Sequence, residues 1–211
     1  NNPYNHNDLM TLIKPIPHPT HHPVIDLPKE IELYDFGQGY NPNRSLLADY
    51  GVGKYNEHRP GMYTGDLFEE KARTVHMGID IGCPVGTPVY AFDDGVILHQ
   101  GYNSAPFDYG HVIVTEHIDK EGSKFWVLLG HLSKTSLQRH STADSFKKGD
   151  LLGWIGASSE NGGWNPHLHI QLSTIQPLTH DFPGVVSLSD RNNALKQYPD
   201  PRCVLGNIYP C

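Results

Sequence analysis

The chain has 211 residues, a formal net charge of -7 and 37% hydrophobic residues. This length predicts one domain with a sizeable core, or one domain with arms. No run of about 18 apolar residues indicates a membrane span. The negative charge argues against a nucleic-acid partner, because such proteins usually present a basic face. Glycine (21) and proline (17) are both frequent, which favours a chain rich in turns over a helical one.

Three cysteines do not decide the redox compartment. Cys203 and Cys211 enclose a short C-terminal loop and could form a disulfide, whereas Cys83 in "DIGCPVGTP" is expected to be a small buried hydrophobe. The chain starts at Asn1 without a charged and then apolar leader. We expect a periplasmic or secreted location, with a cytoplasmic one as the alternative, and a monomer.

Three regions follow from composition along the chain. Residues 1–50 are rich in proline and are expected to form an N-terminal arm packed on the body. The body is expected to span 51–175, and a polar tail wrapped on it to span 176–211. Within the body, "DLFEEKAR" predicts one short helix, with Asp66 as its N-cap and Glu69 three residues later.

From "GTPVYAFDDGVILHQG" onward the sequence has the short apolar runs typical of strands. That first stretch predicts two strands joined by a hairpin turn at Asp93-Asp94-Gly95. "GHVIVTEH", "KFWVLLGHL" and "PHLHIQLS" each predict one strand, and "FKKGDLLGWIGASS" predicts two. Closely spaced strands with turns between them predict a mainly β fold: an antiparallel β-sheet body with long loops and few short helices.

Histidine is unusually frequent, with 14 residues. His76 and Asp80 lie four residues apart in "VHMGIDIG", whose glycines and β-branched residues disfavour a helix. In a straight strand the two side chains would share a face but lie roughly 13 Å apart. If both bind one metal ion, the chain must bend between them, and Gly78 is placed to allow it. The alternative is a surface histidine and an aspartate that caps a turn.

Two further histidine motifs end predicted strands. In "WNPHLHIQL", strand alternation places His167 and His169 on one face, with apolar residues on the other. His131 ends the apolar run "KFWVLLGHL"; taken alone, a histidine there is more often a core or edge residue with satisfied hydrogen bonds than a catalyst. Taken together, two histidines and a carboxylate make a three-ligand zinc set with a fourth position for water. Two further histidines could then act as a base and as a transition-state stabiliser.

Three short motifs, "HMGID", "GHLS" and "HLH", resemble in order and spacing those of the M23 (lysostaphin and LytM type) zinc metallopeptidases. The segments "PVGTPVYAFDDGVI" and "FKKGDLLGWIGASS" also resemble the family's segments between its motifs. The resemblance covers about residues 75–173. "YNEHRPGMYTGDLFEEKARTVHMGIDI" is similar to a subgroup also found fused to kinase-like and aminotransferase domains. The resemblance implies a β-rich body with a substrate groove.

The resemblance also implies the role of each polar residue. By the family's pattern, one Zn²⁺ per chain is bound by His76, Asp80 and His169. His131 and His167 are the unligated catalytic histidines, one taking the proton of a zinc-bound water and the other stabilising the oxyanion. The implied activity is a zinc-dependent metalloendopeptidase that cleaves stem or cross-bridge peptide bonds of peptidoglycan.

Four residues are candidates for substrate binding. Asn103, Tyr109 and Trp164 lie on loops that depart from the family's shorter patterns, and loop packing is the alternative for them. Arg59, in "YNEHRP", could contact a charged substrate end, or could form a structural ion pair with Glu57.

Two other functions are compatible with the same sequence. The first is a zinc amidohydrolase acting on a substrate outside the cell wall, and the second is a non-catalytic M23-like binding module. The arm could also inhibit the site, since "HPTHHP" could supply a fourth zinc ligand.

Overall fold

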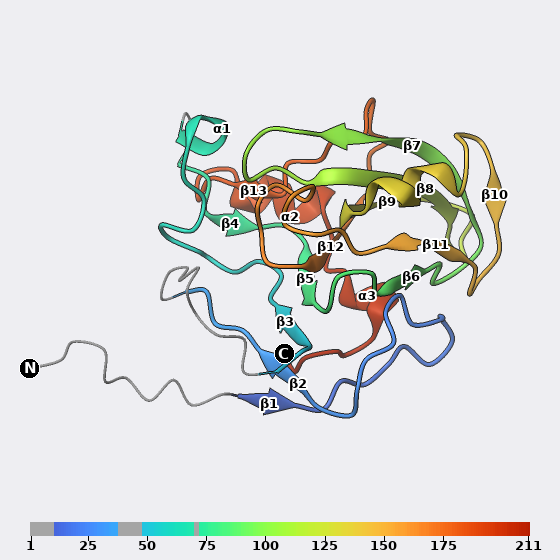
Figure 1. The fold of residues 1–211 in the computed structure, drawn as a ribbon, viewed down its shortest axis with the longest axis horizontal. Helices are drawn as coiled ribbons and strands as arrows, with labels where there is room; N and C mark the ends of the chain where they lie inside the picture. Colours follow the sequence, from blue (N-terminus) through green and yellow to red (C-terminus); the bar gives the residue numbers. More distant parts are fainter. Residues whose placement is uncertain (1–10, 38–47, 70–71) are drawn as a thin grey trace, which may run out of the picture.

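The computed structural model describes residues 11–37, 48–69 and 72–211 (Figure 1). Thirteen strands, three α-helices and one 3-10 helix occur in these residues. In chain order they are β1 (Leu12–Ile13), β2 (Ile31–Leu33), β3 (Gly51–Gly53), α1 (Asp66–Glu69), β4 (Val75–His76), β5 (Ile79–Gly82), β6 (Pro88–Tyr90), β7 (Gly95–Asn103), β8 (Gly110–Ile118), β9 (Lys124–Leu132), η1 (Lys134–Gln138), β10 (Ser145–Phe146), β11 (Leu151–Trp154), β12 (His167–Ser173), β13 (Val185–Val186), α2 (Arg191–Gln197) and α3 (Arg202–Leu205).

One nine-stranded sheet forms the body, in the order β1-β2-β3-β5-β12-β9-β8-β7-β10. All its pairings are antiparallel except that of β2 with β3. Two small sheets, β6 with β11 and β4 with β13, flank it. The predicted mainly β fold with few short helices is therefore confirmed.

Both faces of the sheet are covered, because neighbouring residues on a strand point to opposite sides. On β9, Val127 and Leu129 belong to a core cluster that includes Ile79, Ile81 and Leu168. Leu128, between them in sequence, belongs to a second cluster on the other side of the sheet, with Val75, Met77 and Tyr109. Alternate residues of the central strands therefore face opposite sides of the sheet, one set in each hydrophobic cluster.

The segment predicted as an N-terminal arm extends the sheet in its described part. β1 pairs with β2, and β2 pairs with β3 through Glu32 and Leu33. Ile31 is fully buried, and Val24 and Ile25 join the same core cluster as the central strands. Figure 1 shows these strands along one edge of the molecule.

The predicted hairpin at Asp93-Asp94-Gly95 is wrong, although both of its strands exist. β6 pairs with β11, and β7 pairs with β8 and β10, so the two strands leave the turn toward different sheets. The turn is instead fastened to the following segment, because Asp94 Oδ1 accepts a hydrogen bond from the backbone N–H of Lys148 at 2.9 Å. A turn motif fixes the local bend but not the partner of each strand.

The helix predicted at Asp66 and the three cysteines can also be compared with the structure. Helix α1 does begin at Asp66, but the side chains of Asp66 and Glu69 lie outside the described residues, so the predicted cap stays a prediction. Cys203 and Cys211 are not paired in the structure, and Cys83 is buried in the core as expected. No helix in the described part of the chain is both long and apolar enough to span a bilayer.

Candidate active site

A bend at Gly78 separates β4 from β5 and brings His76 next to Asp80. His76 Nε2 lies 3.2 Å from Asp80 Oδ2, far closer than the roughly 13 Å of a straight strand. Glycine is needed here for space, since a Cβ at Gly78 would lie 2.7 Å from the His169 ring and 2.7 Å from the carbonyl oxygen of Ile170. The bend therefore lies at a residue without a side chain, which leaves room for the ring of His169.

His169 joins this pair from the neighbouring strand β12, directly opposite Asp80 in the ladder. Its Nδ1 lies 3.2 Å from Asp80 Oδ1 and 3.2 Å from His76 Nε2. These three side chains are the one group in the described part of the chain whose ligand atoms could hold a metal ion, with one atom of each lying within 4.8 Å of the others. All three residues are buried.

Hydrogen bonds on the far side of each ring fix which nitrogen carries the proton. His76 Nδ1 donates to the carbonyl oxygen of Lys54 at 3.1 Å. His169 Nε2 donates to Gln171 Oε1 at 2.9 Å, and Gln171 Nε2 in turn donates to the carbonyl oxygen of Pro183 at 3.1 Å. A carbonyl oxygen can only accept, so the Gln171 amide has one orientation and both inward-facing ring nitrogens keep a free lone pair.

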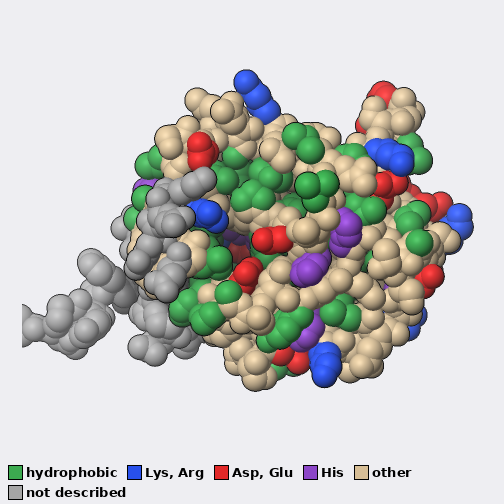
Figure 2. Space-filling view, turned by 90° about the horizontal axis from the view of Figure 1, so that it is seen from above, with side chains coloured by type: hydrophobic (Ala, Val, Ile, Leu, Met, Phe, Trp, Pro, Cys, Tyr) green, Lys and Arg blue, Asp and Glu red, His purple; other side chains and the backbone are tan. Residues whose placement is uncertain are grey.

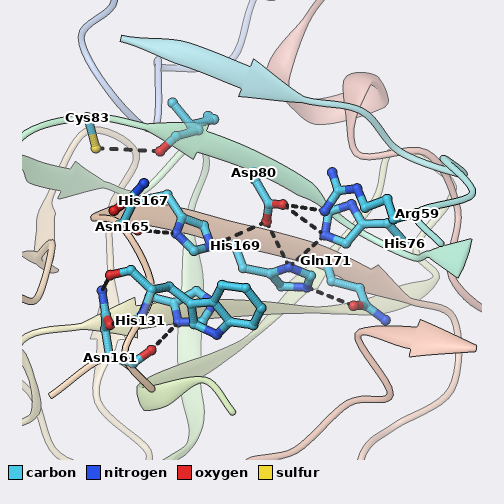
Figure 3. A network of polar contacts seen from close by, with 12 residues as sticks. Arg59, His76, Asp80, Cys83, His131, Asn161, Asn165, His167, His169 and Gln171 are labelled. Atoms are coloured by element: carbon cyan, nitrogen blue, oxygen red, sulfur yellow. Dashed lines mark hydrogen bonds and ion pairs between the residues drawn. The ribbon is translucent and has the colours of Figure 1, made fainter. Parts of the chain in front are cut away.

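The second pair, His131 and His167, lies beside this group (Figure 3). Their ring centroids are 4.2 Å apart, and His167 Nε2 is 3.7 Å from Asp80 Oδ1. Each ring donates from Nδ1 to a backbone carbonyl, His131 to Asn161 at 2.8 Å and His167 to Asn165 at 2.7 Å. Both Nε2 atoms are therefore unprotonated in the neutral rings and able to accept a proton.

His131 reaches this position through an irregular backbone. Its φ of 64° lies in the left-handed region, which is uncommon for a residue other than glycine. The register of β8 against β9 shifts between the pairs His111↔Leu132 and Ile113↔Leu129, so β9 carries one extra residue there. A bulge of this kind redirects a side chain, and it turns His131 toward His167.

Burial keeps His76, His131 and His167 neutral, and neighbouring charges keep Asp80 ionised. Burial lowers the pKa of His76 to about 4 and lowers the pKa values of His131 and His167. Burial opposes ionisation of Asp80, but its interactions with His76 and Arg59 outweigh that effect and hold its pKa well below the ordinary value. Neutral imidazoles beside a carboxylate are the forms that bind a metal ion.

Arg59 does not lie where a substrate contact requires it. Its side chain is fully buried and forms 2.8 Å ion pairs with Glu57 and Asp80. The alternative, a structural ion pair with Glu57, is the one observed. Asn103 is also absent from the cavity lining; its side-chain amide donates to the carbonyl oxygen of His180 at 2.9 Å. The polar groups of both residues are thus engaged in contacts within the chain.

The four histidines and Asp80 line a cavity of about 370 Å³. Figure 2 shows it as a hollow flanked by hydrophobic and acidic side chains. Two of the predicted substrate-binding residues, Tyr109 and Trp164, do line it. Aromatic residues from other segments complete the wall, among them Tyr34, Phe36, Tyr63, Phe68, Phe107 and Phe182.

Sequence reasoning missed several members of the site. Gln171 could have been found, because it continues the alternation of His167 and His169 on one face of β12. Tyr34 and Phe36 carried no signal, since they lie in the segment read as an arm outside the body.

Comparison with known proteins places the chain in a family. The sequence model of Peptidase family M23 matches residues 74–179, and the chain belongs to that family. A curated relative, the glycyl-glycine endopeptidase ALE-1 of Staphylococcus capitis, is 33% identical over 136 residues, which are 64% of this chain and 32% of the relative. The peptidoglycan DD-endopeptidase ShyC of Vibrio cholerae is 29% identical over 141 residues, 65% of this chain and 28% of the relative.

Among solved structures, the catalytic domain of lysostaphin from Staphylococcus simulans is similar with 26% identity and a TM-score of 0.47, over 72% of this chain and 89% of that domain. The chain thus spans about a third or less of the length of the two curated relatives.

Proposed function

We propose that the chain is a zinc-dependent metallopeptidase that hydrolyses peptide bonds of peptidoglycan, in its stem peptides or cross-bridges. One observation carries the proposal. His76 Nε2 and His169 Nδ1 face each other at 3.2 Å, each with a lone pair directed inward, beside the carboxylate of Asp80. Two lone pairs repel at that distance unless a cation lies between them, and the outward nitrogens are already committed to carbonyl acceptors.

Zinc fits this donor set better than magnesium or calcium, which prefer all-oxygen ligands. Ligand bonds of about 2.0–2.1 Å in a tetrahedral zinc site place neighbouring ligand atoms roughly 3.3 Å apart. The 3.2 Å approaches among His76, Asp80 and His169 are close to that spacing. When bound, zinc would activate a water and polarise the carbonyl of the scissile bond.

His131 and His167 are proposed as the proton-transfer pair. Both rings are neutral, and both have Nδ1 held by a backbone carbonyl, so Nε2 is the atom that accepts or returns a proton. The ring that takes the water's proton gains an Nε2–H, which would donate a hydrogen bond to the developing oxyanion or return the proton to the leaving nitrogen. The contact between their rings keeps both nitrogens near one reacting centre.

The named relatives support the substrate class, since ALE-1 and ShyC are endopeptidases and ShyC acts on peptidoglycan. The aromatic wall contributed by Tyr109 and Trp164 suits packing against a peptide backbone and its small side chains.

Metal analysis after zinc-replete purification tests the site. About one zinc per chain is expected for the wild type, and none for His169→Ala. His140→Ala is the matched control, since the His140 ring bonds to the carbonyl oxygen of Leu151, outside the site, and it should retain the metal. A metal-free wild type, or zinc retained by His169→Ala, contradicts the assignment.

Digestion of defined muropeptides, followed by mass analysis of the products, tests the substrate. His131→Ala is expected to keep zinc and lose cleavage. Cleavage of small amides without cleavage of any muropeptide would replace the proposal by the amidohydrolase alternative. Bound zinc with no hydrolysis of either would indicate a binding module.

A further inference from the structure

Arg59 lies against the metal-site group at Asp80 and does not itself line the cavity. Its side chain has no exposed area. The Phe36 ring lies over the guanidinium, 4.8 Å from centroid to Cζ. On another side, a Cβ at Gly53 would lie only 2.8 Å from Nη2. A guanidinium held this closely has one position.

Its donors are distributed over four acceptors. Nε donates to Glu57 Oε1 at 2.8 Å, and Nη1 donates both to Asp80 Oδ2 at 2.8 Å and to the Tyr63 hydroxyl at 2.9 Å. Nη2 approaches the carbonyl oxygen of Lys54 at 3.4 Å. Arginine is the one side chain with enough donors, in a rigid plane, for this arrangement.

These contacts reach both of the first two ligand residues. Asp80 Oδ2 accepts the hydrogen bond from Arg59 and lies 3.2 Å from His76 Nε2, whereas Oδ1 faces His169 and His167 and has no contact with the guanidinium. The carbonyl oxygen of Lys54 also accepts the hydrogen bond from His76 Nδ1. Arg59 therefore contacts Asp80 directly, as Figure 3 shows, and shares with His76 the carbonyl oxygen of Lys54.

We propose that Arg59 is a positioning residue of the metal centre: it clamps one oxygen of Asp80 so that the carboxylate offers the metal a single oxygen, and it aligns His76 through Lys54. This inference rests on the proposed function, because it requires that His76 and Asp80 bind a metal. Its cation also offsets part of the carboxylate charge, which leaves more of the positive charge of the metal for its water.

The backbone around Arg59 is held independently of its side chain. The N–H of Arg59 donates to the carbonyl oxygen of Thr74 at 2.7 Å, and the N–H of His76 donates to the carbonyl oxygen of Glu57 at 3.0 Å. Residues His58 and Val75 form a β-bridge between these bonds. Replacing the side chain therefore leaves the segment attached to β4, and the variant can test position apart from folding.

The test uses Arg59→Lys in the full chain, because lysine keeps the charge but cannot bridge Asp80, Glu57 and Tyr63 together. Zinc affinity is measured by competition with a chromogenic chelator, and coordination by the visible absorption of the Co²⁺-loaded protein. Zinc affinity is expected to fall tenfold or more. The Co²⁺ bands are expected to weaken, because a released carboxylate binds with both oxygens and raises the coordination number.

Arg202→Lys is the matched control, because Arg202 forms a two-point ion pair with Asp200 in the C-terminal tail, at 2.7 Å and 3.0 Å. It should leave affinity and Co²⁺ spectrum unchanged. If Arg59→Lys does not fold, Arg59→Met combined with Glu57→Gln carries the test, since it removes the buried cation together with one of its carboxylate partners.

The outcomes are distinct. Zinc affinity within twofold of the wild type and an unchanged Co²⁺ spectrum, in whichever variant folds, overturns the positioning role. A wild type that binds neither ion overturns the proposed function instead. Weaker zinc binding with altered Co²⁺ bands supports the inference, because a residue that only stabilised the fold would leave the spectrum of the loaded protein unchanged.

Discussion

Substitution of Gly78 by alanine tests whether the space beside His169 is what allows the metal site to form. An ideal Cβ at this position would lie 2.7 Å from Cε1 and 2.7 Å from Nε2 of the His169 ring, and 2.7 Å from the carbonyl oxygen of Ile170. The carbonyl belongs to the central ladder of β12 and β5 and cannot retreat easily. The imidazole must therefore move.

The size of that movement follows from ordinary contact distances. Non-bonded carbon atoms are most stable about 3.5–4.0 Å apart, so the ring of His169 must withdraw by roughly 0.8 Å or more. Metal–ligand distances tolerate about 0.2 Å, and the shift also strains the hydrogen bond from Nε2 to Gln171. We expect zinc affinity to fall at least tenfold. Overpacking of this kind costs about 1–3 kcal/mol, or roughly 2–12 °C in Tm for a chain of this size.

Gly122→Ala separates the two effects. Gly122 lies in the exposed turn between β8 and β9, with φ +85° and nothing within 4 Å of an added Cβ. A side chain in that conformation costs about 1–2 kcal/mol, so the control loses stability without touching the site. Thermal melting of the metal-free proteins and zinc competition are measured on both. Zinc affinity of Gly78→Ala equal to that of Gly122→Ala would refute the reasoning.

Three further predictions concern groups around the site and the core. Gln171→Leu should lower zinc affinity by about 10–100-fold, because His169 loses the acceptor that fixes its proton. Gln100→Leu is the control and should leave affinity unchanged in the same titration, because the Gln100 amide bonds to the carbonyl oxygens of Leu137 and His140 instead. Asp181 has a pKa raised to about 6, first by burial and then by a neighbouring carboxylate. The folded state therefore binds its proton more tightly than the unfolded chain, and its ionisation destabilises the fold as pH rises from about 4 to 6. Asp181→Asn should raise Tm relative to the wild type at pH 7.5 and not at pH 3; a uniform shift would contradict this. The pKa of His117 is lowered by burial to about 4, so stability present above pH 6.5 is lost as pH falls toward 4, by up to about 3 kcal/mol. His117→Phe should flatten that part of the stability profile, measured by urea unfolding between pH 4 and 7.

The part of the site that depends on local pattern could be predicted from sequence. Alternation in "HLHIQ" places His167, His169 and Gln171 on one face of β12, and the structure has them there. The distance across "HMGID" requires a bend between His76 and Asp80 if both bind one ion, and the bend occurs at Gly78. Both inferences use only the rise and the period of a strand.

Other features depend on contacts between segments far apart in the chain. The position of His131 results from one extra residue in β9 relative to β8, which is a property of the pairing and not of either strand alone. The false hairpin at Asp93-Asp94-Gly95 failed for the same reason, because the turn motif carries no information about which strands pair across the sheet. The full burial of Arg59 likewise depends on a distant contact, since its ion pair with Asp80 joins residues 21 positions apart.

The groups that orient the proposed ligands lie largely outside the segment that defines the family. That segment spans residues 74–179, but the carbonyl oxygen that fixes His76 belongs to Lys54, the cation that holds Asp80 is Arg59, and the carbonyl oxygen that orients Gln171 belongs to Pro183. Ligand residues without such partners adopt either tautomer and several ring orientations, which weakens metal binding. The flanking segments therefore belong to the functional unit, and differences in them can change the site while its histidines and aspartate stay the same.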